Sequence, residues 1–348
     1  MDNPDLEQGV VSREDTSTSP YTAASSDAPE EPDFADALFR QRRKHGKFRE
    51  IEVAPGAGPL FDTHCHPQLT PYPASGFARA AVWGVEHLAC VIDLSDEGPR
   101  TIAKYDEWLH EALLLIPSFA QSIGRDPSDV SLPEIRFILG CHPHNASRFD
   151  KQLEETIRAC LKDPRACAIG ESGLDFYYNV SPQDAQISMF KRQIEMSHEL
   201  DLPLCLHVRD AHELAFEILE KEGWPKAGCV LHCYNLDPDT LKPWIERDCY
   251  VGFDGPLTFK NNECVVQSAA IVPEDRLLVE TDAPFMAPEP TRGMACYPHH
   301  VLHIANRLAE VRDKYTVEAK RTFFEKLVEN GLRLYKRDPK PWQEGSEI

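Results

Sequence analysis

The 348-residue chain has no apolar run of the length that a bilayer requires, and its first residues contain no basic region followed by an apolar block. It also has no CxxC pair, because its 11 cysteines are scattered singly, many of them inside apolar runs such as Ala166-Cys167-Ala168-Ile169. Free thiols in a reducing compartment fit this pattern better than a disulfide framework or a thiolate zinc site. We therefore expect a soluble, intracellular protein in the cytoplasm, with the nucleus as the alternative location.

Positive charge is also scarce, since 37 Lys and Arg residues stand against 57 Asp and Glu residues and give a formal net charge of −20. Surfaces that bind nucleic acids nonspecifically, or that bind anionic membranes, are usually basic. The composition therefore argues against both classes of binder, and we expect no membrane partner. It leaves room for a local positive site that bound cations create, because an ion can be the largest charge in a pocket.

Residues 1 to about 33 contain almost no large apolar side chains, so they cannot bury enough surface to order themselves. The basic run at residues 40–47 follows them. We interpret it as a solvated linker and assign it no function, with a nuclear-localisation or phosphate-contacting patch as the alternative. The predicted organisation is a disordered acidic tail and basic linker over residues 1–50, one folded domain over residues 58–337, and a C-terminal tail over residues 338–348.

From about residue 58, short apolar runs alternate with longer amphipathic ones, which is typical of βα units and a parallel sheet. The number of apolar runs is eight, as a closed barrel requires: Leu60 to Thr63, Leu88 to Leu94, Arg136 to Cys141, Ala166 to Gly170, Leu202 to Leu206, Cys229 to Leu231, Tyr250 to Phe253 and Leu277 to Thr281. Helical patterns are predicted at residues 102–116, 184–200, 212–221, 297–311 and 316–335, with an insertion at the barrel rim over residues 117–133. The predicted fold class is α/β, a (β/α)8 TIM barrel.

The residues that close these apolar runs carry the chemistry. The first run ends in His64 and His66, which share one face because strand side chains alternate. Later runs end in Glu171, His207, His232 and Asp282. The carboxyl ends of the strands of a parallel barrel meet on one face, so we expect a metal site formed by all six residues: His64, His66, Glu171, His207, His232 and Asp282.

Six candidate ligands suit two cations, because one catalytic ion typically takes about three protein ligands and keeps a position for water. Glu171 is the natural bridge, since a carboxylate offers two oxygens where a neutral imidazole offers one lone pair. Two cations about 4 Å apart can activate a water and stabilise both oxygens of a displacement at phosphorus, which favours phosphodiester hydrolysis. Glu171 and Asp282 are therefore the predicted catalytic residues. Asp282 could be the general base, and plain ligation is the alternative.

With these residues the chain resembles the TatD family of metal-dependent deoxyribonucleases, within the amidohydrolase-like TIM barrels. The matching segments follow one another in family order over about residues 59 to 336. They are Asp62-Thr63-His64-Cys65-His66, Gly140-Cys141-His142-Pro143-His144, Gly170-Glu171-Ser172-Gly173-Leu174-Asp175-Phe176-Tyr177-Tyr178, Leu206-His207-Val208-Arg209-Asp210-Ala211, His232-Cys233-Tyr234 and Glu280-Thr281-Asp282-Ala283-Pro284-Phe285.

The resemblance implies a 3′-5′ exonuclease that acts on single-stranded DNA with two divalent cations, Mg²⁺ in the first place and Mn²⁺ or Zn²⁺ as alternatives. It also implies that His64, His66 and Asp282 hold one metal, that His207 and His232 hold the other, and that Glu171 lies between them. Ser172 replaces the family's usual Ile, and the segment before residue 134 and the acidic tail are longer than usual. These departures concern substrate preference and not the metal site.

Four further residues are candidates for contact with the substrate: His142, His144, Arg209 and Tyr178. The two histidines could bind a phosphate, and a structural role is the alternative. Arg209 could neutralise phosphate charge with its planar guanidinium, or form a salt bridge with Asp210 or Asp175. Tyr178, like Tyr177 and Tyr234, either stacks a base or packs at the rim.

Two other functions use the same residues differently. Related proteins hydrolyse the acyl bond of D-aminoacyl-tRNA, and a site of this kind does not itself distinguish acyl from phosphoryl centres. A non-catalytic scaffold, with the tail recruiting partners, is the third alternative, and the complete set of metal-capable residues argues against it.

Overall fold

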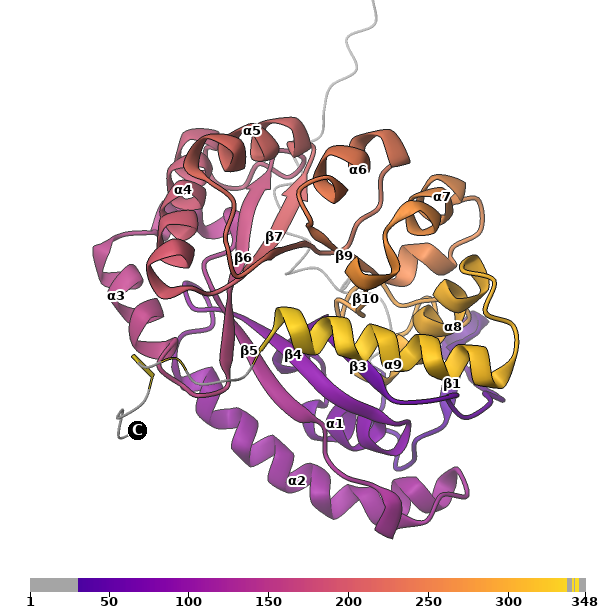
Figure 1. The fold of residues 1–348 in the computed structure, drawn as a ribbon. Coiled ribbons are helices and arrows are strands. Elements are labelled where there is room, and N and C mark those ends of the chain that lie inside the picture. The colour runs from indigo at the N-terminus through magenta and orange to yellow at the C-terminus, as the bar shows by residue number, and fades with distance from the viewer. Residues whose placement is uncertain (1–30, 337–339, 341, 344–348) are drawn as a thin grey trace, which may run out of the picture. The chain divides into compact units, whose positions relative to one another are not determined.

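The computed structural model describes residues 31–336, 340 and 342–343. Eight parallel strands, each paired with the next one along the chain, form a ring that helices surround (Figure 1). This architecture confirms the predicted (β/α)8 barrel. Its strands are β3 (Leu60–Cys65), β4 (Val85–Asp93), β5 (Glu134–Gly140), β6 (Ala166–Asp175), β7 (Leu204–Arg209), β8 (Cys229–Leu231), β9 (Tyr250–Phe253) and β10 (Leu277–Val279).

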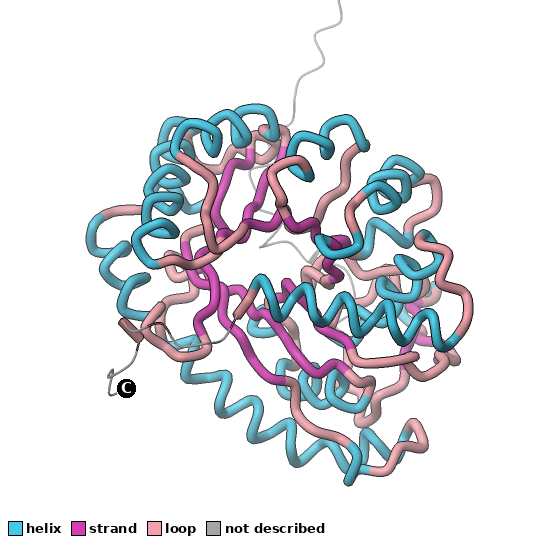
Figure 2. Tube along the Cα trace, in the orientation of Figure 1, coloured by secondary structure: helices cyan, strands magenta, loops and turns pink. Residues whose placement is uncertain are grey.

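The helices form the outer layer, with the strands enclosed by them (Figure 2). They are α1 (Pro73–Val82), α2 (Arg100–Ser122), α3 (Lys151–Cys160), α4 (Gln183–Leu200), α5 (His212–Glu222), α6 (Pro238–Ile245), α7 (Glu263–Ile271), α8 (Val301–Val311) and α9 (Val317–Leu334). Helix α9 crosses one end of the ring (Figure 1). There the Asn330 amide donates to the carbonyl oxygen of Leu277, just where β10 begins, at 3.0 Å. Helix α9 therefore covers the amino ends of the strands and leaves the carboxyl ends for the site.

The strands are buried on both faces, which explains their near-continuous apolar sequence. One face packs against the helices in the main core, and the other fills the interior of the barrel together with residues of α9. All eleven cysteines are free thiols, as predicted, and Cys167 and Cys205 belong to the interior packing.

The first and last strands close the ring through polar contacts at their carboxyl ends. The backbone N–H of Asp282 donates to the His64 carbonyl at 2.9 Å, and that of His66 donates to the Ala283 carbonyl at 2.7 Å. The buried Asp62 carboxylate accepts hydrogen bonds from the Thr281 backbone N–H at 2.9 Å and from the Thr281 hydroxyl at 2.6 Å. Closure of the barrel thus fixes His64 and His66 beside Asp282.

The rim insertion predicted over residues 117–133 is partly wrong, because α2 continues through Pro117 to Ser122. A proline inside a helix removes one hydrogen bond and normally ends the helix, as we expected here. The carbonyl that loses its partner belongs to Leu113, whose side chain is 52% exposed, so this turn faces solvent. Beyond the proline, Phe119 and Ala120 are buried, and their packing extends the helix.

The basic run predicted as a linker lies instead in an antiparallel hairpin of β1 (Phe39–Arg42) and β2 (Phe48–Ile51). The buried Phe39 ring packs 4.7 Å from the ring of Trp83, whose indole N–H donates to the carbonyl of Ala37 at 2.7 Å. The hairpin therefore belongs to the folded unit. The acidic tail predicted up to residue 33 lies outside the described residues as far as residue 30.

The predicted C-terminal tail is likewise only partly described. Within it, the buried Gln343 amide donates to the carbonyl of Leu161 at 2.9 Å, so this position packs on the folded unit. Among the helices of the described ranges, none has both the length and the apolar character that crossing a bilayer demands.

We expect Asp62→Ala to lower the free energy of unfolding by about 2 to 4 kcal/mol, because it leaves two buried donors of Thr281 without an acceptor. Urea denaturation followed by circular dichroism measures this loss. The matched control is Glu107→Ala on the exposed face of α2, which we expect to change stability by less than about 0.5 kcal/mol. Similar stabilities of the two variants would contradict the closing role of Asp62.

Candidate metal centre

The structure brings all six predicted ligands together at the carboxyl ends of the strands. His64 and Glu171 lie within β3 and β6, and His207 lies within β7. His66 and His232 directly follow β3 and β8, and Asp282 lies three residues beyond the end of β10. Five of the six residues are buried, and His207 is partly buried. The six side chains come from five strands, so the closed sheet alone makes them neighbours.

Glu171 occupies the middle of this group. Its Oε1 lies 2.9 Å from His232 Nε2 and 3.3 Å from His207 Nδ1, and its Oε2 lies 3.4 Å from His66 Nε2. Oε1 also lies 3.6 Å from His64 Nε2, so one carboxylate oxygen faces three imidazoles and the other faces His66. A carboxylate with both oxygens among imidazoles can bridge two cations.

Asp282 lies beside the two histidines at the carboxyl end of β3. Its Oδ1 lies 3.5 Å from His66 Nε2 and 3.8 Å from His64 Nε2. Three sets of residues each place one ligand atom per residue within 4.8 Å of the others: His64 with His66 and Asp282, His64 with Glu171 and His232, and His142 with Glu171 and His207. Imidazole nitrogens and carboxylate oxygens together suit divalent cations.

Four buried atoms of this group lack a hydrogen-bond partner among the described residues: His64 Nε2, His66 Nε2, Glu171 Oε1 and Asp282 Oδ1. A buried polar atom without a partner costs about 1 to 3 kcal/mol, so native structures contain few of them. Here they gather in one place and include two carboxylate oxygens. Bound cations would satisfy all four, so the residues present fit a metal centre.

The neighbouring charges shift the pKa values of Glu171, His66 and His207 in different directions. Burial alone would raise the pKa of Glu171, but the nearby His232 and His64 lower it well below its ordinary value. Burial alone would lower the pKa of His66, but the neighbouring carboxylates of Asp282 and Glu171 raise it to about 9. Burial alone would also lower the pKa of His207, but its hydrogen bond to Asp175 and the neighbouring Glu171 carboxylate raise it to about 9. Without metal, these two imidazoles therefore carry protons at neutral pH.

Asp175 orients the outer side of the cluster. Its Oδ2 lies 3.1 Å from His207 Nε2 and 2.9 Å from His144 Nε2. Burial would raise the pKa of Asp175, but these two hydrogen bonds lower it. Because Asp175 engages Nε2, the Nδ1 atom of His207 faces Glu171. Such partners fix the orientation of ligating histidines.

The predicted fourth strand ends at Gly170, and a salt bridge to Arg209 is the only role that the sequence suggests for Asp175. The strand instead continues to Asp175 as β6. This continuation depends on Gly173, which has a φ of +145° and whose added Cβ would collide with the His207 carbonyl oxygen. Glycine inside a strand often marks a place where another backbone approaches closely, so Gly173 is the sequence feature that could have predicted the longer strand.

The candidate substrate residues separate into two groups. His142 lies inside the cluster, with its Nε2 4.0 Å from Glu171 Oε1, and His144 is buried against Asp175. Arg209 instead lies over the rings of Tyr177 and Tyr178, 4.1 and 4.7 Å from their centroids. These two rings are 57% and 37% exposed. Both histidines thus face inward, whereas Arg209 and the two tyrosines form an exposed aromatic and cationic group.

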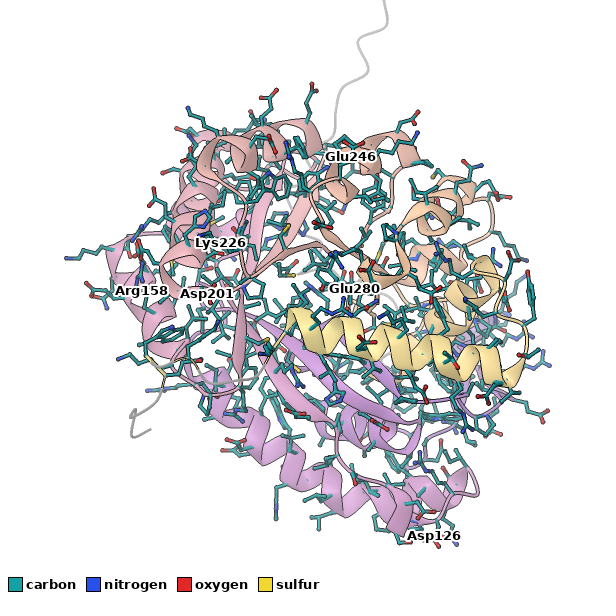
Figure 3. The ribbon with its side chains drawn as sticks, in the orientation of Figure 1. Asp126, Arg158, Asp201, Lys226, Glu246 and Glu280 are labelled. Carbon is teal, nitrogen blue, oxygen red and sulfur yellow. The ribbon has the colours of Figure 1, made fainter. Side chains whose placement is uncertain are left out.

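Base stacking by Tyr234 is wrong, because its ring is buried and its hydroxyl donates to the carbonyl of Asp237 at 2.7 Å. Asp254, a buried acid that directly follows β9, is not among the residues predicted from the sequence. Asp254 closes the seventh apolar run, so the rule that found the other ligands applies to it as well. Glu280, labelled in Figure 3, is another buried acid and lies inside the ring of strands.

Residues 61–336 match the family model described as TatD related DNase. The uncharacterized metal-dependent hydrolase YabD of Bacillus subtilis is 35% identical over 175 residues, which are 50% of this chain and 69% of that protein. The 3′-5′ ssDNA/RNA exonuclease TatD of Enterobacter lignolyticus is 35% identical over 178 residues, which are 50% of this chain and 68% of that protein. These two alignments thus span about half of this chain.

Solved structures show the same fold. The TatD homolog YJJV of Escherichia coli superimposes with a TM-score of 0.64 at 21% identity, over 79% of this chain and 97% of its own. A hydrolase TatD family protein from Entamoeba histolytica gives a TM-score of 0.66 at 14% identity, over 82% of this chain and 100% of its own.

We expect metal binding at pH 7.5 to release roughly two protons, because His66 and His207 must lose theirs before they can coordinate a cation. Affinity for Mn²⁺ should therefore fall as the pH decreases below about 9, the pKa of both imidazoles. Titration calorimetry in buffers with different ionisation enthalpies measures the released protons. His66→Asn should release about one proton fewer, and His110→Asn on the exposed side of α2 should match the wild type. Metal binding without proton release would contradict these assignments.

Proposed function

The chain belongs to the TatD-related DNase family of metal-dependent hydrolases, and we propose that it hydrolyses phosphodiester bonds of single-stranded DNA from the 3′ end. The observation that carries this proposal is the position of Glu171, whose Oε1 faces His64, His207 and His232 while its Oε2 faces His66. The exonuclease name of the relative from Enterobacter lignolyticus supports the choice of substrate.

In this proposal His64, His66 and Asp282 would hold one cation, His207 and His232 would hold a second, and Glu171 would contribute to both. Two divalent cations supply the charge that activates a water and neutralises the oxygens at phosphorus. We propose Mg²⁺ as the physiological ion, with Mn²⁺ and Zn²⁺ as alternatives, because carboxylates suit the first two ions and imidazoles suit the last.

Asp282 is the proposed general base. A carboxylate that holds a cation lies beside the water that the cation activates, so Asp282 would be placed to accept the proton of that water. The hydrogen bond from its backbone N–H to the His64 carbonyl fixes its place in the site. Its Oδ1 lies close to both His64 and His66, so plain ligation is the alternative role.

The preference for single strands is supported by the exposed group of Tyr177, Tyr178 and Arg209. Unpaired bases present their faces to aromatic rings, and one stacked base contributes about 1 to 3 kcal/mol to binding. The guanidinium of Arg209 would pair with a backbone phosphate beside them. The eleven free thiols support a reducing compartment, and we propose the cytoplasm, with the nucleus as the alternative.

The direct test is a parallel assay of the purified full chain on 3′-labelled single-stranded DNA, duplex DNA, single-stranded RNA and D-aminoacyl-tRNA. Each reaction contains Mg²⁺, Mn²⁺ or Zn²⁺, with an EDTA-treated control. We expect release of the 3′ label from single-stranded DNA, and loss of this activity in EDTA. Turnover of D-aminoacyl-tRNA alone would replace the nuclease proposal with the deacylase alternative. Turnover of none of the substrates would favour the non-catalytic scaffold.

We expect Glu171→Ala to lower kcat by more than about 100-fold, beyond the range that is typical when a partner of a metal ligand is lost. Arg209→Ala should lower kcat/KM about tenfold, mainly through KM, because it removes one charged contact. Arg307→Ala on the surface of α8 is the matched control and should be neutral. Steady-state kinetics on a 3′-labelled oligonucleotide measures all three variants, and equal losses for Glu171→Ala and Arg209→Ala would contradict the bridging role.

A further inference from the structure

A fourth group of metal-capable side chains lies beside the centre described above and uses one of its residues. Cys233, Asp254 and Asp282 each place one ligand atom within 4.8 Å of the other two. Cys233 directly follows His232 after β8, and Asp254 directly follows β9. This group therefore extends the site to the seventh strand of the barrel.

Asp254 is the residue that points to a ligand. It is only 1% exposed, and its Oδ1 has no hydrogen-bond partner among the described residues. Its other oxygen accepts a weak hydrogen bond from Cys233 Sγ at 3.2 Å. A buried carboxylate is costly unless it is paired or coordinates a metal. The polar atoms near it include the Asp282 carboxylate, which adds negative charge and no donor.

We propose that Cys233, Asp254 and Asp282 form a third cation site, which takes a thiophilic divalent ion such as Zn²⁺. Three protein ligands and one open position match the usual coordination of zinc outside purely structural sites. The thiolate makes the site soft, so Mg²⁺, which prefers oxygen ligands, should not fill it. Binding replaces the thiol proton of Cys233, which leaves to solvent.

Glu280 holds Cys233 in position. Its carboxylate accepts a hydrogen bond from the backbone N–H of Cys233. A side chain on Gly252 of β9 would collide with the same carboxylate, so the glycine provides the space that Glu280 occupies. The cysteine is thus anchored from inside the barrel, and its sulfur reaches Asp254.

The third site shares Asp282 with the set of His64 and His66. An ion bound by Cys233 and Asp254 would therefore compete for the carboxylate, or bridge through it, and would change the affinity of the first site. Such coupling is reciprocal, so occupancy of the first site would change the affinity for zinc by the same factor.

Cobalt is the probe that tests this proposal, because Co²⁺ bound to a thiolate gives a charge-transfer band in the near ultraviolet and Co²⁺ bound to histidine and carboxylate does not. The metal-free full chain is titrated with Co²⁺. We expect the band in the wild type, its loss in Cys233→Ser, and at least tenfold weaker binding in Asp254→Asn. Zn²⁺ should displace the band and Mg²⁺ should not.

Two matched variants identify the thiol. Cys264→Ser removes an exposed cysteine and should keep the band. Cys205→Ser removes the thiol that lies 3.3 Å from His64 Nδ1 and should also keep it. A wild type without the band, a band that survives in Cys233→Ser, or a band that disappears only in Cys205→Ser would overturn the proposal.

A second measurement on the wild type covers the case in which a variant does not fold. Alkylation of Cys233, followed by peptide mass spectrometry, should slow at least tenfold with Zn²⁺ and remain unchanged with Mg²⁺. Equal alkylation rates with both ions would contradict the third site. Neither experiment uses a nucleic acid, so failure of the nuclease proposal and failure of this one are distinguishable.

Discussion

The site depends on one carboxylate at the centre of a ring of imidazoles. Glu171 lies within 4.0 Å of nitrogen atoms of five histidines that four different strands position. Without the negative charge of Glu171, protonated histidines would repel one another, and without cations its Oε1 would remain buried and unpartnered. The arrangement is therefore complete only with bound metal, which explains why so many polar groups share a buried space.

Closure of the sheet makes that arrangement possible. His64 and His66 meet Asp282 only because β3 and the segment after β10 exchange backbone hydrogen bonds, with Asp62 holding Thr281 behind them. These contacts lie at the same end of the barrel as the proposed ligands, so the polar groups that close the ring also set the positions of His64 and His66 relative to Asp282. Folding and formation of the site are in this sense one event.

The sequence predicted the barrel and the six clustered residues because both follow simple local rules: buried strands are apolar, and each run ends in a chemically distinctive residue. It failed where tertiary packing overrides local signals. Pro117 should end a helix, but the burial of Phe119 extends it. The hairpin of residues 39–51 depends on Trp83, which lies far from it in sequence. Asp175 was not predicted because its strand continues through Gly173, past the end of the apolar run. Asp254 was not predicted although it directly follows an apolar run, as the six clustered residues do.

The central claim is that Glu171 bridges two divalent cations. Crystals of the full chain soaked in Mn²⁺ and measured at the manganese absorption edge test it directly. The account predicts two anomalous peaks about 4 Å apart, one beside His64, His66 and Asp282 and the other beside His207 and His232, each within about 2.3 Å of a Glu171 oxygen. A single peak that does not contact Glu171, or no peak among these residues, would contradict it.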